Sequence, residues 1–210
     1  MNNLKVLVVP ESGFSANCYI IYSEYSKKGL IIDPACPLEV IEKNIGDKGI
    51  VLEKIVLTHG HSDHIATVEE LRNKYSIPVL VHKDDEPMLE DGALNFSTQM
   101  FRSPIEFKAD EFMAHGDRVS LEDGFEFEVI HTPGHTPGGV CLKFGDILVT
   151  GDTLFQGSIG RTDFPGGNFA DIIESIKTKL LSLDGDTIIL PGHGPHSTIA
   201  NERDYNPFLR

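Results

Sequence analysis

The sequence predicts a layered α/β fold in which helices pack outside mixed β-sheets. Short β-rich runs alternate with stretches of helical periodicity along the chain. Gly145 and Asp146 link two of these runs as a tight hairpin would, so antiparallel pairing is expected as well. A chain of 210 residues with 40% hydrophobic residues can bury a full core, and we expect a single domain over residues 1–210.

The first half of the chain alternates strands with helices. We expect strands over residues 5–9, 18–22, 30–33, 54–58 and 78–82. One helix is expected over residues 38–48, and a second begins near Ser62 or Asp63. The buried face of that second helix carries apolar residues at helical spacing, namely Val68, Leu71 and Tyr75. Residues 84–117 show no clear period, and only a short helix near residues 85–89 is predicted there.

The second half begins with a strand of period two. Phenylalanine and valine alternate with glutamate over residues 125–129, which predicts one buried and one solvated face. Further strands are expected over residues 140–144, 147–150 and 187–190. Asn168 is suited to cap a helix whose apolar residues recur at helical spacing, namely Ile172, Ile176, Leu180 and Leu183.

Composition limits the partners of the protein. The formal net charge of −14 would repel phosphate backbones and anionic lipid surfaces, so we expect neither nucleic acid nor membrane as a partner. The charge does not identify an oligomeric state. A small molecule is the expected partner.

The cysteines and the N-terminal run indicate a compartment. Cys18, Cys36 and Cys141 are widely separated and form no CxxC pair, so a reducing environment is the simpler interpretation. The apolar run at residues 4–9 is too short for a membrane span and lacks a signal-peptide cleavage pattern. We therefore expect a cytoplasmic protein.

A dense group of metal-ligand residues follows the strand expected at residues 54–58. His59, His61 and His64 fall within six positions, and Asp63 lies among them. In an extended segment, residues two apart point to the same side, so His59 and His61 can converge on one ion. Imidazole and carboxylate donors without sulfur suit zinc, and also iron or manganese.

Three more ligand-type residues follow other predicted strands in glycine-rich turns, and they are His135, Asp152 and His193. Catalytic sites collect residues from several loops, so this placement favours one shared site. Asp33 either fixes a ligand histidine or merely ends its strand. The remaining histidines are expected to lie outside the metal site, and they are His82, His115, His131 and His196. Gly166-Gly167 is interpreted as a turn, because neither a Walker lysine nor GxGxxG is present.

This order of motifs resembles the metallo-β-lactamase superfamily. It starts with the run THGHSDH at residues 58–64 and continues through the turns of His135, Asp152 and His193. The resemblance covers nearly the whole chain and implies a four-layer αββα sandwich with the site along one edge. It further implies two divalent ions, with zinc expected first. One ion would be held by His59, His61 and His135, the other by Asp63, His64 and His193, with Asp152 bridging.

Four runs resemble the small bacterial branch related to glyoxalase II, the hydroxyacylglutathione hydrolase-like enzymes. They are NCY, HTPGHTPG, GDTLFQGSIGRTDFPGG and PGHGPHSTI. The resemblance implies a thioesterase that hydrolyses S-lactoyl or other 2-hydroxyacyl thiols. Larger glyoxalase II enzymes add a C-terminal helical domain that helps to bind glutathione, whereas this chain ends at Arg210. The thiol of the substrate therefore stays open.

Two other functions stay open at this point. Persulfide dioxygenase shares the GRTDF stretch, and that resemblance would imply a single iron held by His59, His135 and Asp152. A binding module, in which the metal stabilises a scaffold for a partner, is the third alternative. Within GRTDF, the resemblance implies that Arg161 contacts a substrate carboxylate, and a salt bridge with Asp163 or another loop carboxylate is the alternative.

The expected chemistry is hydrolysis by a metal-bound hydroxide. Two cations that share a water would lower its pKa from about 15.7 toward neutrality and polarise the attacked carbonyl. Asp63 and Asp152 are the carboxylates that we expect to serve catalysis in addition to binding metal. A thiolate leaving group, with a pKa of about 8.5, departs without a dedicated general acid.

Overall fold

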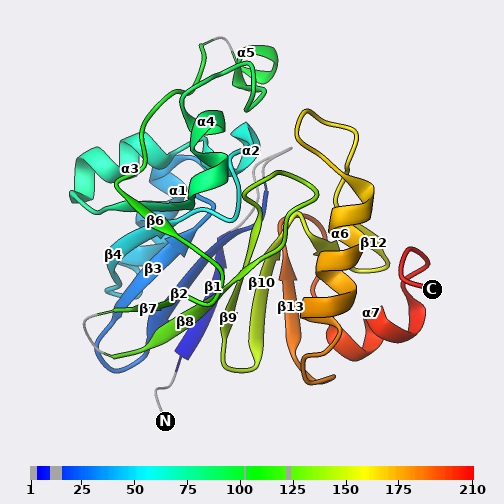
Figure 1. Ribbon diagram of the computed structural model, residues 1–210. Helices are drawn as coiled ribbons and strands as arrows, with labels where there is room; N and C mark the ends of the chain where they lie inside the picture. Colours follow the sequence, from blue (N-terminus) through cyan, green and yellow to red (C-terminus); the bar gives the residue numbers. More distant parts are fainter. Residues whose placement is uncertain (1–3, 10–15, 102, 122–123) are drawn as a thin grey trace.

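Two six-stranded mixed sheets lie face to face, and helices cover the outer face of each sheet (Figure 1). The computed structural model describes residues 4–9, 16–101, 103–121 and 124–210. The arrangement confirms the four-layer αββα sandwich that the resemblance implied.

The first sheet contains the amino-terminal strands. Its order is β1 (Leu4–Val9), β2 (Cys18–Ser23), β3 (Lys28–Ile32), β4 (Val51–Val56), β5 (Val79–His82) and β6 (Glu111–Met113). The β1–β2 and β2–β3 pairs are antiparallel, and the later pairs are parallel. The parallel strands are connected by α1 (Leu38–Gly46) and α3 (Val68–Tyr75), which pack on the outer face.

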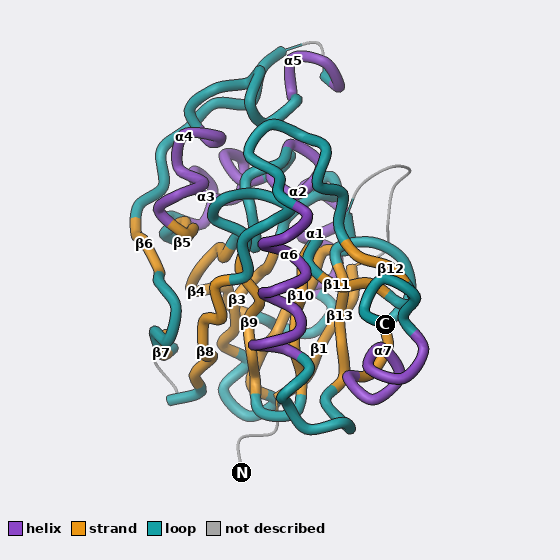
Figure 2. Tube along the Cα trace, turned by 45° about the vertical axis from the view of Figure 1, so that its right-hand side comes forward, coloured by secondary structure: helices purple, strands orange, loops and turns teal. Residues whose placement is uncertain are grey.

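The second sheet contains the carboxyl-terminal strands. Its order is β14 (Ser197–Thr198), β13 (Ile188–Pro191), β10 (Ile147–Gly151), β9 (Val140–Phe144), β8 (Glu126–His131) and β7 (Arg118–Ser120). Helix α6 (Phe169–Ser175) lies in front of this sheet in Figure 2 and continues as the π-helical turn η2 (Ile176–Leu180). The outer layer also includes α7 (Ile199–Tyr205), and β11 (Leu154–Phe155) pairs separately with β12 (Ser158–Ile159).

Alternate residues of one strand point into different layers of the sandwich. In β3, Leu30 and Ile32 lie in the core between the two sheets, whereas Ile31 packs in the core under α1 and α3. In β9, Leu142 lies between the sheets and Cys141 packs under α6. The period of two in these strands thus builds three apolar cores from two sheets.

The expected strands are confirmed with shifts of a few residues at their ends. Strand β4 ends at Val56 instead of residue 58, because the Thr58 amide donates to the Asp33 carboxylate at 2.8 Å. The predicted hairpin between β9 and β10 is present, and Gly145 adopts the left-handed conformation (φ 61°) that its turn requires.

The helices differ more from the prediction than the strands do. The helix expected from Ser62 is divided into α2 (Ser62–Ile65) and α3, with Thr67 between them. Thr67 is held there because its amide donates to Pro34 O and its hydroxyl donates to Cys36 O. The region without clear period contains η1 (Lys83–Asp85), α4 (Glu86–Leu89) and α5 (Ser97–Met100). Among the described residues, no helix has the length and apolar character needed to cross a membrane.

The fold brings the segments after four strands to one edge. Strands β3 and β4 are parallel neighbours in the first sheet, and β10 and β13 are parallel neighbours in the second. Side chains that follow these strands contact one another across the two sheets, as in the 3.4 Å approach of His64 Nε2 to Asp152 Oδ1. This edge is where the candidate site lies.

Candidate metal centre

The turn after β4 presents three histidines in a short length of chain. Residues between Val56 and α2 have no regular structure, and His61 is extended (φ −73°, ψ 148°) where it precedes α2. The His59, His61 and His64 side chains are buried, and Asp63 is partly exposed. The change from extended chain to helix turns His64 away from the direction of His59 and His61.

Three further loops complete the site. His135 lies between β8 and β9, Asp152 follows β10, and His193 follows β13. Close approach of these loops depends on Gly192, since a Cβ there would lie 2.2 Å from Asp152 Oδ1 and 2.8 Å from His64 Cε1. The seven residues that the sequence predicted are therefore all brought together.

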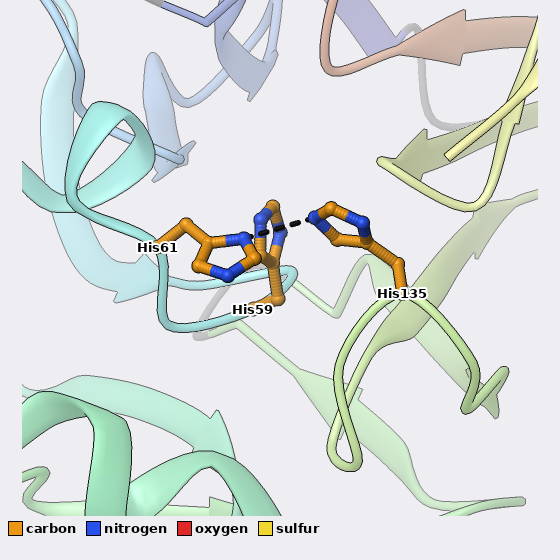
Figure 3. A group of neighbouring side chains, drawn as sticks. All are labelled: His59, His61 and His135. Carbon is orange, nitrogen blue, oxygen red and sulfur yellow. Dashed lines mark hydrogen bonds between the residues drawn. The ribbon is translucent and has the colours of Figure 1, made fainter. Parts of the chain in front are cut away.

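Six of the seven residues form two groups of potential ligands. The first donor group is His59, His61 and His135, whose rings point toward one another in Figure 3. In this group, His61 Nδ1 lies 2.9 Å from His135 Nε2. The second donor group is Asp63, His64 and His193, with Asp63 Oδ2 lying 3.2 Å from His193 Nε2. Within each group the donor atoms lie within 4.8 Å of one another.

Asp152 lies between the two donor groups. Its Oδ1 is 3.4 Å from His64 Nε2, and its Oδ2 is 3.5 Å from His135 Nε2 and 3.7 Å from His193 Nε2. One carboxylate thus faces both groups, which is the placement expected of a bridging ligand.

Several atoms of the seven residues are buried without a hydrogen-bond partner. They are His59 Nε2, His61 Nε2, His64 Nε2 and Asp152 Oδ1. Buried polar atoms are normally paired, because an unpaired one loses its hydration without compensation. A divalent cation fits this donor set, since imidazole nitrogen and carboxylate oxygen are ligands for zinc and iron.

Hydrogen bonds on the far side of the rings orient the donors. His64 Nδ1 lies 2.9 Å from Asp33 Oδ2, so Asp33 fixes the ring of a histidine in the second donor group rather than merely ending its strand. Thr58 Oγ1 donates to Asp33 Oδ2 at 2.6 Å and can therefore only accept from His59 Nδ1, at 3.1 Å. His135 Nδ1 donates to the Arg161 carbonyl at 2.7 Å. These bonds place the proton on Nδ1 of His59, His64 and His135, so Nε2 carries the lone pair with which each of these rings can bind metal.

The protonation of the first donor group suits metal binding. Burial lowers the pKa of His61 to about 3, and it also lowers the pKa of His59 and His135. Neutral imidazole is the form that binds metal, so these rings are ready at neutral pH. Burial opposes charge on His64 too, but Asp152 and Asp33 raise the pKa of this ring above its ordinary value.

An open cleft of about 600 Å³ gives access to the donors. Its wall is largely apolar and includes Phe96, Met100, Phe155, Ile159 and Phe164. The Phe96 and Phe164 rings contact each other at a centroid distance of 4.7 Å, and each also contacts His61. The sequence pattern does not reveal this aromatic pair, because its two members lie in loops without periodicity.

Arg161 lines the cleft and is engaged by its own loop. Its Nε and Nη2 atoms donate to the Asp163 carboxylate at 3.0 and 2.8 Å, and its guanidinium lies 4.1 Å from the Phe164 ring centroid. The predicted alternative of a salt bridge with Asp163 is thus present. The contact with a substrate carboxylate stays a prediction.

His82 and His131 form a separate pair near Asp84. Their rings stack at 4.0 Å with an interplanar angle of 10°. Lone pairs of an imidazole lie in the ring plane, so parallel rings do not aim them at one point. This pair therefore does not add to the metal centre.

The fold and the donor groups are typical of metallohydrolases. The profile described as the metallo-beta-lactamase superfamily matches residues 12–193, and the chain belongs to this superfamily.

Similar proteins within this superfamily have different names. The chain is 37% identical over 210 residues to hydroxyacylglutathione hydrolase GloC of Haemophilus influenzae, with 98% of each chain covered. The crystal structure of BLEG-1 B3 metallo-beta-lactamase has a TM-score of 0.90 at 38% identity, covering 98% of this chain and 99% of that one. TTHA1623 in a di-iron-bound form has a TM-score of 0.87 at 33% identity, covering 97% and 100%.

Proposed function

We propose that this protein is a glyoxalase II-like thioesterase that hydrolyses S-lactoyl or other 2-hydroxyacyl thiols. The observation that carries the proposal is a pair of complete donor groups, with Asp152 between them, in an open cleft with an apolar wall. The name of the GloC relative, which aligns over 98% of both chains, favours a hydroxyacyl thioester. The partner would be a small molecule.

We further propose that the two donor groups hold two divalent ions. Zinc is expected from the nitrogen and oxygen donors, and the di-iron form of TTHA1623 makes iron a strong alternative. Two bound ions would lower the pKa of a water and polarise the thioester carbonyl.

The chain itself contributes orientation. Asp33, Thr58 and the Arg161 carbonyl fix the rings of His64, His59 and His135, so that each Nε2 faces the shared space. Asp152 would belong to both ion sites, and Asp63 would complete the second one. A thiolate needs no protonation to leave, so the reaction does not call for a further general acid.

The cleft wall would orient the substrate. Phe96 and Phe164 cover His61 on one side and would pack against apolar parts of the acyl or thiol group. Arg161 also lines the cleft. Its guanidinium would bind a substrate carboxylate if it released Asp163.

We also propose that the protein is cytoplasmic. Cys18, Cys36 and Cys141 are buried free thiols, which supports a reducing compartment.

The test combines metal analysis with substrate comparison. Purified protein, analysed for metal content, is given S-lactoyl derivatives of several thiols, and the released thiol is measured with a chromogenic reagent. We expect thioester turnover with about two ions per chain and loss of turnover after chelation. A preference for a chromogenic β-lactam over every thioester would overturn the proposal. Oxygen uptake with a persulfide substrate and a single iron would instead favour the dioxygenase, and absence of all turnover would favour a binding module.

A further inference from the structure

Asp85 is a buried carboxylate that belongs to neither donor group. It lies at the end of η1, after β5, and its side chain is 0% exposed. Acidic side chains are rarely buried to this degree without a specific partner. Its partners therefore indicate why the fold keeps it.

The two oxygens of Asp85 bind both loops that supply the first donor group. Oδ2 accepts from Gly60 N at 3.0 Å and from Thr136 Oγ1 at 2.8 Å, and Oδ1 accepts from Gly138 N at 2.6 Å. Gly60 lies between His59 and His61, and Thr136 directly follows His135. One carboxylate thus connects the backbone beside all three imidazoles.

Both loops also pack closely against the segment that contains Asp85. A Cβ on Gly138 would lie 2.6 Å from Asp85 N and 2.8 Å from its Cγ, and a Cβ on Gly60 would lie 2.8 Å from Met88 Cβ. Side chains at these two positions would push the loops away from Asp85. This accounts for two motif glycines that metal binding alone leaves unexplained.

The hydrogen bonds match an ionised carboxylate. Among the described residues, the hydrogen-bond partners of Asp85 are three neutral donors, and a carboxylate offers only acceptors. Burial raises the pKa of Asp85 to about 6, against the effect of the three donors. The fold therefore keeps a costly buried group, as is typical of positions that serve a site.

We infer that Asp85 is a positioning residue, which sets the distance between the turn of His59 and His61 and the turn of His135. This inference rests on the proposed function, because it assumes that the first donor group holds a metal ion. Asp85 touches neither metal nor substrate in this role. It acts by fixing the backbone from which the three imidazoles extend.

The direct test is the D85N variant of the full-length chain. Whichever way the Asn amide is turned, its NH₂ group faces the amide of Gly60 or of Gly138, so one of these amides loses its acceptor. Zn²⁺ affinity is measured by competition with a chromophoric chelator, and the absorption spectrum of bound Co²⁺ reports ligand geometry. We expect one of the two binding steps to weaken about tenfold or more, with a changed Co²⁺ spectrum.

Glu202 offers a matched control. It is also 0% exposed, and its carboxylate accepts from Gly157 N at 2.7 Å and from Asn206 Nδ2 at 2.9 Å, outside both donor groups. E202Q should reduce the free energy of unfolding, as D85N does, but should leave Zn²⁺ affinity and the Co²⁺ spectrum unchanged. This separates positioning from general stability.

T136V removes one of the three donors without charge or volume change and keeps the test available if D85N does not fold. We expect a smaller loss of affinity in the same binding step. Wild-type affinity and spectrum in folded D85N, or in T136V alone, would overturn the inference and leave the proposed function intact. A wild-type protein that binds no Zn²⁺, Co²⁺ or Fe²⁺ would overturn both.

Discussion

The two donor groups differ in burial and in the way they are held. The first donor group consists of three buried imidazoles, and Asp85 ties its two loops together. In the second donor group, the side chains of Asp63 and His193 are 23% and 39% exposed, and only His64 is fully buried. The first group is thus a closed set of rings, whereas the second opens to the cleft.

The second donor group has its own connection through the chain before β2. Ala16 N donates to Asp63 O at 3.3 Å, and Asn17 N donates to Gly192 O at 2.7 Å, beside His193. Asn17 Nδ2 also donates to Pro191 O and Gly194 O. Each group is therefore held by a different element: η1 for the first, and residues 16 and 17 for the second. The two sites can therefore be weakened separately, apart from Asp152, which lies between them, and Asp33, which bonds His64 directly and reaches His59 through Thr58.

The largest effect is expected where the two groups meet. D152N keeps the shape of the side chain but replaces one carboxylate oxygen that faces His64 or His135. Loss of a partner that merely orients a ligand costs about 10–100-fold, so loss of a shared ligand should lower kcat/KM at least about hundredfold. Metal content should fall below two ions per chain. Full metal content and turnover in D152N would remove the bridging role.

The difference between the groups is tested by removing one histidine from each. H193A leaves the first donor group complete, so one ion per chain should bind with near wild-type affinity. H135A removes one imidazole from the first donor group and should weaken Zn²⁺ binding by that group about 100-fold. Titration of each variant with Zn²⁺ against a chelator measures both steps. Equal losses in the two variants would show that the groups are not separable.

Asp33 should affect mainly the second donor group, because it bonds His64 directly and reaches His59 only through Thr58. D33N disturbs the bond that holds His64 Nδ1, so we expect Zn²⁺ binding by the second donor group to lose about 10–100-fold in affinity. Asp33 also accepts from Thr58, so the free energy of unfolding should fall by about 1–3 kcal/mol. Chelator competition in D33N and D85N side by side checks the assignment, and a D33N effect confined to the step that D85N weakens would contradict it.

Much of the fold followed from periodicity, because the strands are two-sided. Both faces of β3 are covered, so its consecutive residues Leu30, Ile31 and Ile32 are all buried. In β8, the alternation around Phe127 marks the face that packs between the sheets. The break at Thr67 could not be predicted, since it depends on bonds to Pro34 O and Cys36 O, distant in sequence. Helix α7 was missed although a signal exists: Thr198 Oγ1 accepts from Asn201 N and caps it.

The ligand-type residues were predictable because each follows a strand in a glycine-rich turn. Their division into two groups came from the family resemblance and agrees with the geometry, while metal binding by each residue stays a prediction. Asp85 and Phe96 were missed for a physical reason. Both lie in the stretch without periodicity, and Phe96 has the uncommon left-handed backbone (φ 67°) that sequence pattern does not reveal.

The smallest effect is expected at the cleft wall over the first donor group. Phe96 is held in its uncommon conformation beside Asn95, which is buried and donates to Met88 O and Ile105 O. A backbone kept in such a conformation costs free energy and is typical of functional sites. F96A removes the ring that covers His61, so KM for a thioester with an apolar thiol should rise by roughly tenfold at most, with little change in kcat.

The matched control for the wall is Phe112, an exposed phenylalanine in β6 that is not part of the cleft lining. F112A should leave both kinetic constants at their wild-type values. KM is measured for the S-lactoyl esters of an apolar and of a polar thiol. Loss of metal would affect both esters equally, whereas loss of packing would raise KM mainly for the apolar one. If F96A raised KM equally for both thiols, the Phe96 ring would not contribute to substrate choice. Its only role would then be to cover the histidines of the first donor group.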